Sequence, residues 1–209
     1  MKHDAYGWHA GFYDRLYEPA AKILRDVGLT IFPPRENIAI LDVGCGTGSQ
    51  LALYRRAGCR LVGIDNSPAM LAVAKQKLGQ AAELCIGDAT RMPLAASRFD
   101  LISVVFVLHE MDPELRPVVL KECQRLLKPG GRIMLMDYHP GPFSKVMGKI
   151  WHLLIKLMEI SAGRKHYGNY RDFIASGGLE SLVADSPLHL VRRYVSEHGV
   201  TAIYLIAAR

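Results

Sequence analysis

Three acidic residues end successive apolar runs of the chain, and a cluster of glycines follows the first of them. Asp42 lies in LDVGCGTG, Asp65 ends RLVGID and Asp88 ends ELCIGD. Glycine permits positive φ angles and lets another molecule approach the backbone closely. A carboxylate at the end of the next strand, about 20 residues after such a loop, can accept hydrogen bonds from both ribose hydroxyls. The combination predicts a loop that binds a nucleoside.

The spacing of the glycines narrows the ligand. In GCGTG the third glycine comes two residues after the second, whereas a dinucleotide-binding loop places it three residues after, and the chain has no GK[ST] segment to clamp a phosphate. Several carboxylates around the loop would repel pyrophosphate but suit a ligand that carries a ribose and a cationic tail. S-adenosylmethionine has this pattern, with a sulfonium and an ammonium group. A tight turn that binds nothing, with carboxylates that only cap loops, is the alternative interpretation.

The elements that must position these residues follow from the apolar pattern. Short β-rich runs alternate with helical patterns, which is typical of an α/β fold with a parallel sheet. The predicted strands are 38–43, 60–65, 83–88, 99–108, 131–138, 188–197 and 200–209. The predicted helices between them are 48–57, 68–78 and 113–127.

Two local signals refine this prediction. Asp112-Pro113 favours an N-cap followed by proline at the first helical position. Only His198-Gly199 separates the last two strands, too few residues for a helical crossover, so these strands must run antiparallel. We therefore expect a doubly wound seven-stranded sheet, mostly parallel with the last strand reversed, whose strand carboxyl ends face one ligand crevice.

Composition excludes several classes of protein. A chain of 209 residues that is 50% hydrophobic can bury one large core, so a single domain is expected. Its four cysteines form no CxxC pair, which predicts neither a metal site nor a disulfide framework. No segment is typical of a signal peptide or a membrane span, and we expect a cytoplasmic protein. The formal charge of +6 permits an acidic partner without requiring one.

The sequence resembles the class I S-adenosylmethionine-dependent methyltransferases of the small single-domain type, over about residues 37–138. The resemblance rests on four ordered segments, LDVGCGTG, GIDNSPAMLAVAK, GDATRMPLAASRFDLI and LLKPGGRIMLMD. It implies a Rossmann-like methyltransferase fold and one domain over 1–209. Within that domain it implies an N-terminal cap at about 1–30 and a lid insertion at about 140–180.

The resemblance also implies which residues bind S-adenosylmethionine. Gly44 and Gly46 would contact its methionyl part, and Asp65 would contact its ribose. The other implied cofactor contacts are Tyr13 in the cap, Asp42 and Cys45 at the loop, Asn66 and Met70 against the adenine, Asp88 and Ala89 at the adenine amino edge, and Val105 and Phe106 beneath the cofactor.

Methyl transfer from a sulfonium mainly requires alignment of the acceptor and exclusion of water. If the acceptor must lose a proton, the candidate bases are His109 and Glu110 after the fourth strand, and Tyr138 and His139 after the fifth. We select His109 as the catalytic base. The alternative is that these histidines cap helices or fill the rim of the site.

The absence of two motifs narrows the choice of methyl acceptor. No [DN]PP[YFW] segment follows the fourth strand and no Pro-Cys nucleophile is present, so nucleic acid is not expected. A small-molecule or lipid-like acceptor remains. A nicotinamide-dependent oxidoreductase, or a non-catalytic partner protein of the same fold, is the alternative function, and the sequence leaves the oligomeric state open.

The segment 142–160 is long and apolar, and Lys145, Lys149 and Lys156 recur in it at helical spacing. It predicts either a plain cover over the sheet edge or a lid that also contacts an anionic membrane surface.

Overall fold

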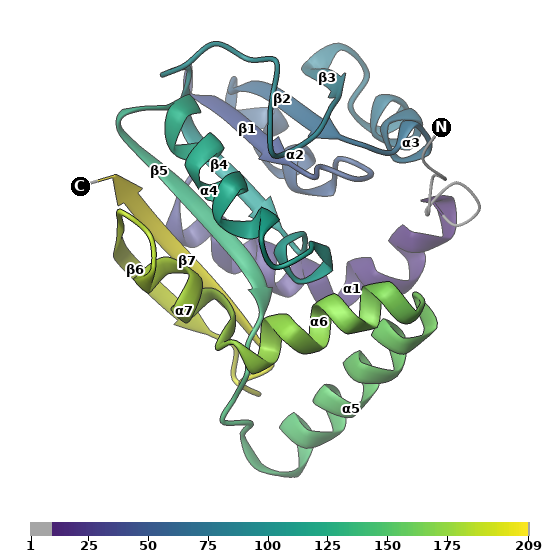
Figure 1. The fold of residues 1–209 in the computed structure, drawn as a ribbon. Coiled ribbons are helices and arrows are strands. Elements are labelled where there is room, and N and C mark those ends of the chain that lie inside the picture. The colour runs from purple at the N-terminus through teal and green to yellow at the C-terminus, as the bar shows by residue number, and fades with distance from the viewer. Residues whose placement is uncertain (1–9, 209) are drawn as a thin grey trace.

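The computed structural model describes the backbone of residues 10–208 and the side chains of residues 21–208 except those at 56 and 145. Seven strands form one sheet in the order β3-β2-β1-β4-β5-β7-β6 (Figure 1). The strands are β1 (Ala39–Val43), β2 (Arg60–Asp65), β3 (Ala82–Ile86), β4 (Phe99–Val105), β5 (Leu127–Tyr138), β6 (Leu188–Val195) and β7 (Thr201–Ala208).

Strands β1 to β5 pair in parallel, whereas β7 is antiparallel to both β5 and β6. The predicted doubly wound α/β sheet with a reversed last strand is confirmed. The order also places the ends of β1 and β4 at the centre of the sheet, where the chain reverses its direction of winding and ligands bind in such folds.

Helices cover both faces of this sheet. They are α1 (Ala10–Ile31), α2 (Ser49–Tyr54), α3 (Pro68–Leu78), α4 (Leu115–Leu126), α5 (Lys145–Ser161), α6 (Arg164–Ala175) and α7 (Gly178–Ala184), with short 3-10 helices η1 (Arg55–Ala57), η2 (Gly79–Ala81) and η3 (Leu108–Glu110). Helices α5 and α6 form a hairpin beyond the end of β5, at the lower side of the view in Figure 1.

The two faces have separate apolar cores because side chains alternate along each strand. On one face Leu41 and Val104 pack with residues of α4, α6 and α7. On the other face Ile40 and Leu101 pack with residues of α1, α2 and α3. The sheet is therefore buried on both sides, and its strand ends are held rigidly.

Several predicted boundaries were wrong, among them the start of β5, which begins at Leu127 rather than at 131. Helix α4 begins at Leu115 with Glu114 at the N-cap, so Asp112 is not the cap and Pro113 is not in the helix. The carboxylate of Asp112 instead pairs with Lys165 and accepts a hydrogen bond from Asn169. Strand β4 ends at Val105, three residues earlier than predicted, because the backbone reaches φ +56° at Phe106.

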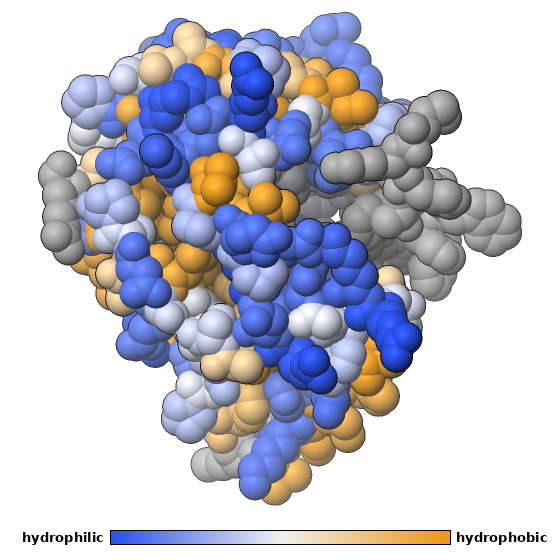
Figure 2. Space-filling view, in the orientation of Figure 1, coloured by the Kyte–Doolittle hydropathy of each residue, from blue (hydrophilic) through white to orange (hydrophobic). Residues whose placement is uncertain are grey.

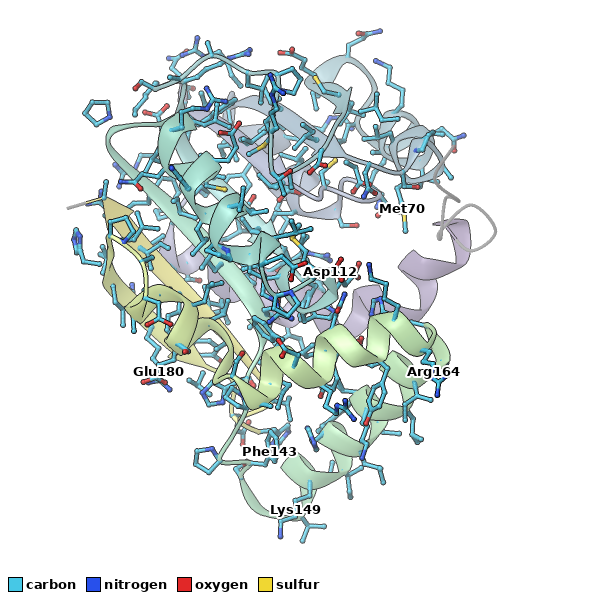
Figure 3. The ribbon with its side chains drawn as sticks, viewed as in Figure 1. Met70, Asp112, Phe143, Lys149, Arg164 and Glu180 are labelled. Carbon is cyan, nitrogen blue, oxygen red and sulfur yellow. The ribbon has the colours of Figure 1, made fainter. Side chains whose placement is uncertain are left out.

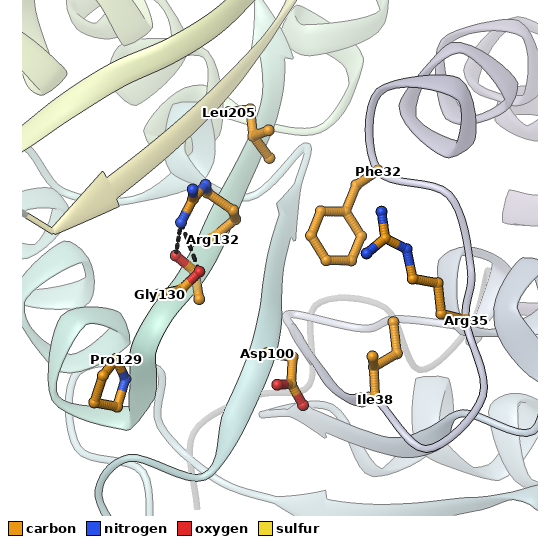
Figure 4. Close-up of a pocket in the computed structure, with 9 residues that line it drawn as sticks. Phe32, Arg35, Ile38, Asp100, Pro129, Gly130, Arg132 and Leu205 are labelled. Atoms are coloured by element: carbon orange, nitrogen blue, oxygen red, sulfur yellow. Dashed lines mark hydrogen bonds between the residues drawn. The ribbon is translucent and has the colours of Figure 1, made fainter.

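A cavity of about 360 Å³ lies at the amino ends of β1 and β4 (Figure 4). Ile38 and Asp100 border it next to these strands, and Phe32 and Arg35 border it from the segment after α1. This is the end of the sheet opposite the glycine loop, so the cavity is not part of the site described below.

Candidate active site

The glycine loop after β1 is held by backbone hydrogen bonds to β2. The N–H groups of Gly44 and Cys45 both donate to the carbonyl oxygen of Ile64, at 2.8 and 3.0 Å. Both Gly44 and Gly46 have positive φ angles, which disfavour residues with a side chain.

These two glycines differ in their surroundings. A Cβ atom at Gly44 would lie 2.4 Å from a methyl group of Val107, whereas a Cβ atom at Gly46 would meet no atom of the described residues within 4 Å. The packing of the protein itself therefore requires glycine at position 44. Gly46 presents bare backbone to open space, as a loop that receives a ligand must.

Asp65 ties this loop to the end of β2. Its carboxylate accepts hydrogen bonds from the backbone N–H groups of Gly46 and Ser67, each at 2.8 Å. The glycine loop and the strand-end carboxylate were both predicted from the sequence. In the structure they lie together, close to the start of α3.

Asp42 is placed differently from the other acids. Its side chain is 2% exposed, and it accepts a hydrogen bond of 2.6 Å from the hydroxyl of Ser103 on β4. Burial raises the pKa of Asp42 to about 7, although the Ser103 hydrogen bond and the charge of Arg25 oppose this shift. The carboxyl group lies inside the sheet layer beneath the loop, and its contact with a cofactor stays a prediction.

The remaining cofactor candidates lie around the same strand ends. Asp88 is exposed and accepts hydrogen bonds from the backbone and side chain of Thr90. The others are exposed Asn66, buried Met70 in the first turn of α3 (Figure 3), buried Cys45 and Val105, and half-buried Ala89 and Phe106. Tyr13 falls within α1, but its side chain lies outside the described part of the structure.

A strained turn connects the glycine loop to the other half of the site. Phe106 adopts φ +56°, an unfavourable angle for an aromatic residue, and its N–H donates to the carbonyl of Met136 on β5. The next residue, Val107, packs over Gly44. His109 follows in η3, so it lies two residues after Val107, the residue that contacts the glycine loop.

His109 is buried and fixed by Asp137, the penultimate residue of β5. Its Nδ1 lies 2.7 Å from one carboxylate oxygen of Asp137, and the other oxygen accepts the backbone N–H groups of Leu108 and His109. A carboxylate can only accept, so Nδ1 carries the proton of this bond. The Nε2 atom is thereby directed away from the sheet.

The pKa of His109 reflects these neighbours. Burial lowers the pKa, but the charge and hydrogen bond of Asp137, aided by Glu110 and Glu159, outweigh burial and raise it to about 9. The imidazole therefore holds a proton more strongly than an ordinary histidine does, and it can act as a base only in the fraction of molecules in which Nε2 is deprotonated.

Residues of the α5–α6 hairpin face Nε2 of His109. The carboxylate of Glu159 on α5 lies 3.8 Å from Nε2, and that of Glu110 lies 3.9 Å from it. The same Glu159 oxygen lies 2.6 Å from Nε2 of His166 on α6. The nearby imidazoles hold the pKa of Glu159 below its ordinary value even though burial opposes this.

Aromatic rings surround the histidine. The ring centroids of Tyr138, Tyr170 and Phe106 lie 4.7, 6.3 and 6.5 Å from that of His109. The imidazole is thus both oriented by Asp137 and packed among aromatic rings.

His139, another base candidate from the sequence, contacts different groups. Its Nδ1 lies 3.2 Å from the carbonyl oxygen of Gly199, and its Nε2 lies 3.2 Å from the Arg193 guanidinium. The pKa of His139 is lowered, chiefly by burial. Of the two predicted histidines, only His109 has a carboxylate partner that orients it.

Asp137 and Glu159 were not among the site residues predicted from the sequence. Asp137 could have been predicted from the sequence, because it ends an apolar run as Asp42 and Asp65 do. Glu159 could not, because a single acid on an amphipathic helix usually faces solvent. It turns inward here because α6 brings His166 beside it.

Known proteins resemble this chain in sequence and in fold. The family model described as a methyltransferase domain matches residues 41–135. A demethylmenaquinone methyltransferase from Thermotoga maritima is 29% identical over 157 residues, which cover 73% of this chain and 67% of that protein. A malonyl-[acyl-carrier protein] O-methyltransferase from Pectobacterium atrosepticum is 32% identical over 154 residues, which cover 72% of this chain and 57% of that protein.

Several of the curated relatives are matched over only about half of their length. Among solved structures, a SAM-dependent methyltransferase from Aquifex aeolicus shares the fold with a TM-score of 0.62 at 19% identity, over 87% of this chain and 88% of that one. The predicted family resemblance is confirmed. Residues 41–135 match a methyltransferase domain, as the resemblance to class I S-adenosylmethionine-dependent methyltransferases implies.

Proposed function

We propose that this chain transfers a methyl group from S-adenosylmethionine to a small or lipophilic acceptor at His109. The observation that carries the proposal is the position of the His109–Asp137 pair, which lies in aromatic surroundings directly after the turn that packs on the glycine loop. This arrangement puts an oriented proton acceptor beside the expected cofactor loop.

The residues at the loop fit the cofactor. The open space beside Gly46 leaves room for a ligand against the backbone, and Asp65 supplies the carboxylate expected for a ribose. When bound, S-adenosylmethionine supplies a methyl group activated by its sulfonium. We retain the other predicted contacts as proposals, namely Tyr13, Asp42, Gly44, Cys45, Asn66, Met70, Asp88, Ala89, Val105 and Phe106.

His109 would act on the acceptor side as a base. Asp137 holds Nδ1, so Nε2 is the atom that receives the proton when the acceptor becomes a nucleophile. The Asp137 charge also stabilises the imidazolium that results. Because His109 is 3% exposed, entry of an acceptor requires α5 and α6 to move outward and take Glu159 and His166 with them.

The aromatic side chains around His109 support a particular class of acceptor. Phe106, Tyr138 and Tyr170 present ring faces and edges suited to a flat or apolar molecule. The relatives' names, which include a demethylmenaquinone methyltransferase, are consistent with a quinone-like acceptor. A carboxylated thioester chain is the second candidate class, since the other relative is a malonyl-[acyl-carrier protein] O-methyltransferase.

We also propose that the outer face of α5 contacts an anionic membrane surface. This face carries eight exposed apolar side chains, Val146, Met147, Ile150, Trp151, Leu153, Leu154, Leu157 and Ile160. Figure 2 shows hydrophobic surface along the lower edge of the molecule, where α5 lies in Figure 1.

The charges on α5 support the same proposal. Lys149 and Lys156 are exposed beside the apolar face, with Lys149 at the outer end of the helix in Figure 3, whereas the helix's one acid, Glu159, is turned inward. Such a helix can lie in the interface of an anionic bilayer. No helix in the described part of the chain has the length and apolarity needed to span a membrane.

The test of the proposed function is transfer of label. The protein is incubated with methyl-labelled S-adenosylmethionine and, separately, with a naphthoquinol, an acyl-carrier-protein thioester and a bacterial lipid extract, and products are identified by mass spectrometry. Label in an organic product, absent with heat-denatured protein, supports the proposal. Cofactor binding without label transfer to any acceptor would instead support a non-catalytic protein of this fold.

A further inference from the structure

We propose that His109, Glu159 and His166 form a binding site for a divalent transition-metal cation, with Zn²⁺ as the best match, and that the cation competes with the proton for His109. The metal site stands on its own geometry. Only its effect on catalysis rests on the proposed function, because it assumes that Nε2 of His109 is the base. No metal site was predicted from the sequence, because only pairs of cysteines were considered as ligands.

The three ligand atoms converge from three different elements. Nε2 of His109 in η3, a carboxylate oxygen of Glu159 in α5 and a nitrogen of His166 in α6 all lie within 4.8 Å of one another. Zinc is bound by histidine nitrogen and carboxylate oxygen at about 2.0–2.2 Å, which places neighbouring ligand atoms of a tetrahedral site about 3.4 Å apart. The observed separations of 2.6 and 3.8 Å bracket that value, so small side-chain rotations suffice.

Glu159 provides an independent observation. Its Oε2 atom is buried and has no hydrogen-bond partner of acceptable geometry among the described residues, despite its 2.6 Å approach to His166. Buried carboxylate oxygens are normally hydrogen-bonded, because an unpartnered one costs free energy. A cation bound by both groups would supply the partner that this carboxylate oxygen lacks.

The surroundings favour a cation as well. Asp137 holds the other ring nitrogen of His109, which is the outer-shell partner that metal-bound histidines usually have. Glu110 adds a second carboxylate 3.9 Å from Nε2, within reach of a fourth ligand position. Two imidazoles and two carboxylates without a thiol match Zn²⁺ and its neighbours in the transition series better than Mg²⁺ or Ca²⁺, which prefer oxygen alone.

Cation binding would have two consequences. It would tie α5 and α6 to η3, which keeps the acceptor side closed. It would also take the lone pair of Nε2, so His109 could not accept a proton while the cation is bound. The cation would therefore inhibit methyl transfer rather than support it.

The experiment uses Co²⁺ and Zn²⁺ as probes on the metal-free full-length protein. Co²⁺ is added and its visible absorption recorded, since four-coordinate Co²⁺ absorbs far more strongly than hydrated Co²⁺, and Zn²⁺ affinity is then measured by displacement. We expect one site per chain, with affinity at least tenfold weaker in Glu159→Gln and in His166→Gln. His152→Gln is the matched control, because this α5 histidine stacks on Phe143 outside the cluster and should bind the metal normally.

The outcomes separate the two proposals. Absence of the four-coordinate spectrum, or equal affinity in all variants with thermal melts confirming that each is folded, would overturn the metal site. Tight binding lost in the two variants, together with loss of label transfer on Zn²⁺ addition, supports both halves. Tight binding with undiminished label transfer would keep the site but contradict the role of His109 as base.

Discussion

The proposed cofactor half and the proposed acceptor half of the site are built in different ways. The cofactor half, around Gly46 and Asp65, is made of backbone groups and strand ends within one βαβ unit. The acceptor half, around His109, draws its side chains from β5, η3, α5 and α6, which are distant in sequence. Backbone geometry fixes the first half, whereas the packing of a helical hairpin completes the second.

This difference implies that the two halves can be damaged separately. A change in the glycine loop should abolish cofactor binding and leave the acceptor side intact. A change at His109 should do the reverse. The effects expected from His109→Gln and Gly46→Asn test that separation, and smaller effects are expected at Asp42 and on α5.

The largest effect is expected from His109→Gln. Removal of a general base lowers the rate of transfer by roughly 100- to 10,000-fold, and cofactor affinity should stay within about twofold of wild type. The measurement is single-turnover label transfer from S-adenosylmethionine at saturating cofactor, once the acceptor is identified. His152→Gln serves as control and should keep the wild-type rate. A rate within threefold of wild type in His109→Gln would show that His109 is not the catalytic base.

Gly46→Asn should abolish measurable cofactor binding. Asparagine tolerates positive φ better than other residues with a side chain, and no atom of the described residues lies within 4 Å of the new Cβ. The fold should therefore survive while the side chain fills the ligand space. Gly130→Asn in β5, where φ is +78° and no described atom would lie within 4 Å of the new Cβ, is the control for a side chain at positive φ. Normal calorimetric titration of Gly46→Asn would show that the ligand does not approach this backbone.

Asp42→Asn should change the pH dependence of stability. The folded pKa of Asp42, about 7, lies above its ordinary value of 3.8, so its contribution to stability is complete below pH 3.8 and is lost as pH rises toward 7. Asparagine mimics the protonated form. Relative to wild type, the variant should therefore gain about 1.4 kcal/mol per pH unit across this window.

The measurement is urea unfolding of both proteins, without cofactor, at several pH values from 4 to 8. A constant difference between the two free energies of unfolding at all pH values would mean that Asp42 is already ionised in the folded protein. A parallel loss of cofactor affinity would favour a direct role for Asp42 in the cofactor half.

The smallest effect is expected at the membrane face of α5. Each lysine near an anionic bilayer contributes about 1 kcal/mol, so the double change Lys149→Glu and Lys156→Glu should weaken sedimentation with phosphatidylglycerol vesicles at low salt. Cofactor affinity should not change. Lys121→Glu on α4, an exposed lysine on another face, is the control. Equal partitioning of wild type and the double variant would leave the outer face of α5 as an ordinary cover.

The same two halves show what a sequence can predict. Strand β2 was predicted with its observed bounds, because its signal lies in a short local motif. Gly46 and Asp65, which were both predicted to border one crevice, lie within hydrogen-bond distance of each other. Asp42 carries the same strand-end signature, yet it turns to Ser103 on β4, and only the pairing of the two strands decides that.

The acceptor half was predicted only in part. His109 was selected because it follows a strand, but the partners that give it a function come from other elements. Glu159 turns inward only because α6 folds back along α5, and no local pattern of residues specifies that contact. The start of α4 was also misplaced, because Asp112 is engaged by Lys165 and Asn169 of α6 rather than by its own helix.

The most direct test of the account is the affinity for S-adenosylmethionine, measured by calorimetry on wild type, Asp65→Ala and His109→Gln. Loss of charge-assisted hydrogen bonds at Asp65 costs about 1.5–3 kcal/mol, so we predict binding that is roughly 10- to 150-fold weaker in Asp65→Ala, with unaltered affinity in His109→Gln. Wild-type affinity in Asp65→Ala, in a variant whose thermal melt shows it to be folded, would contradict the placement of the cofactor at the glycine loop.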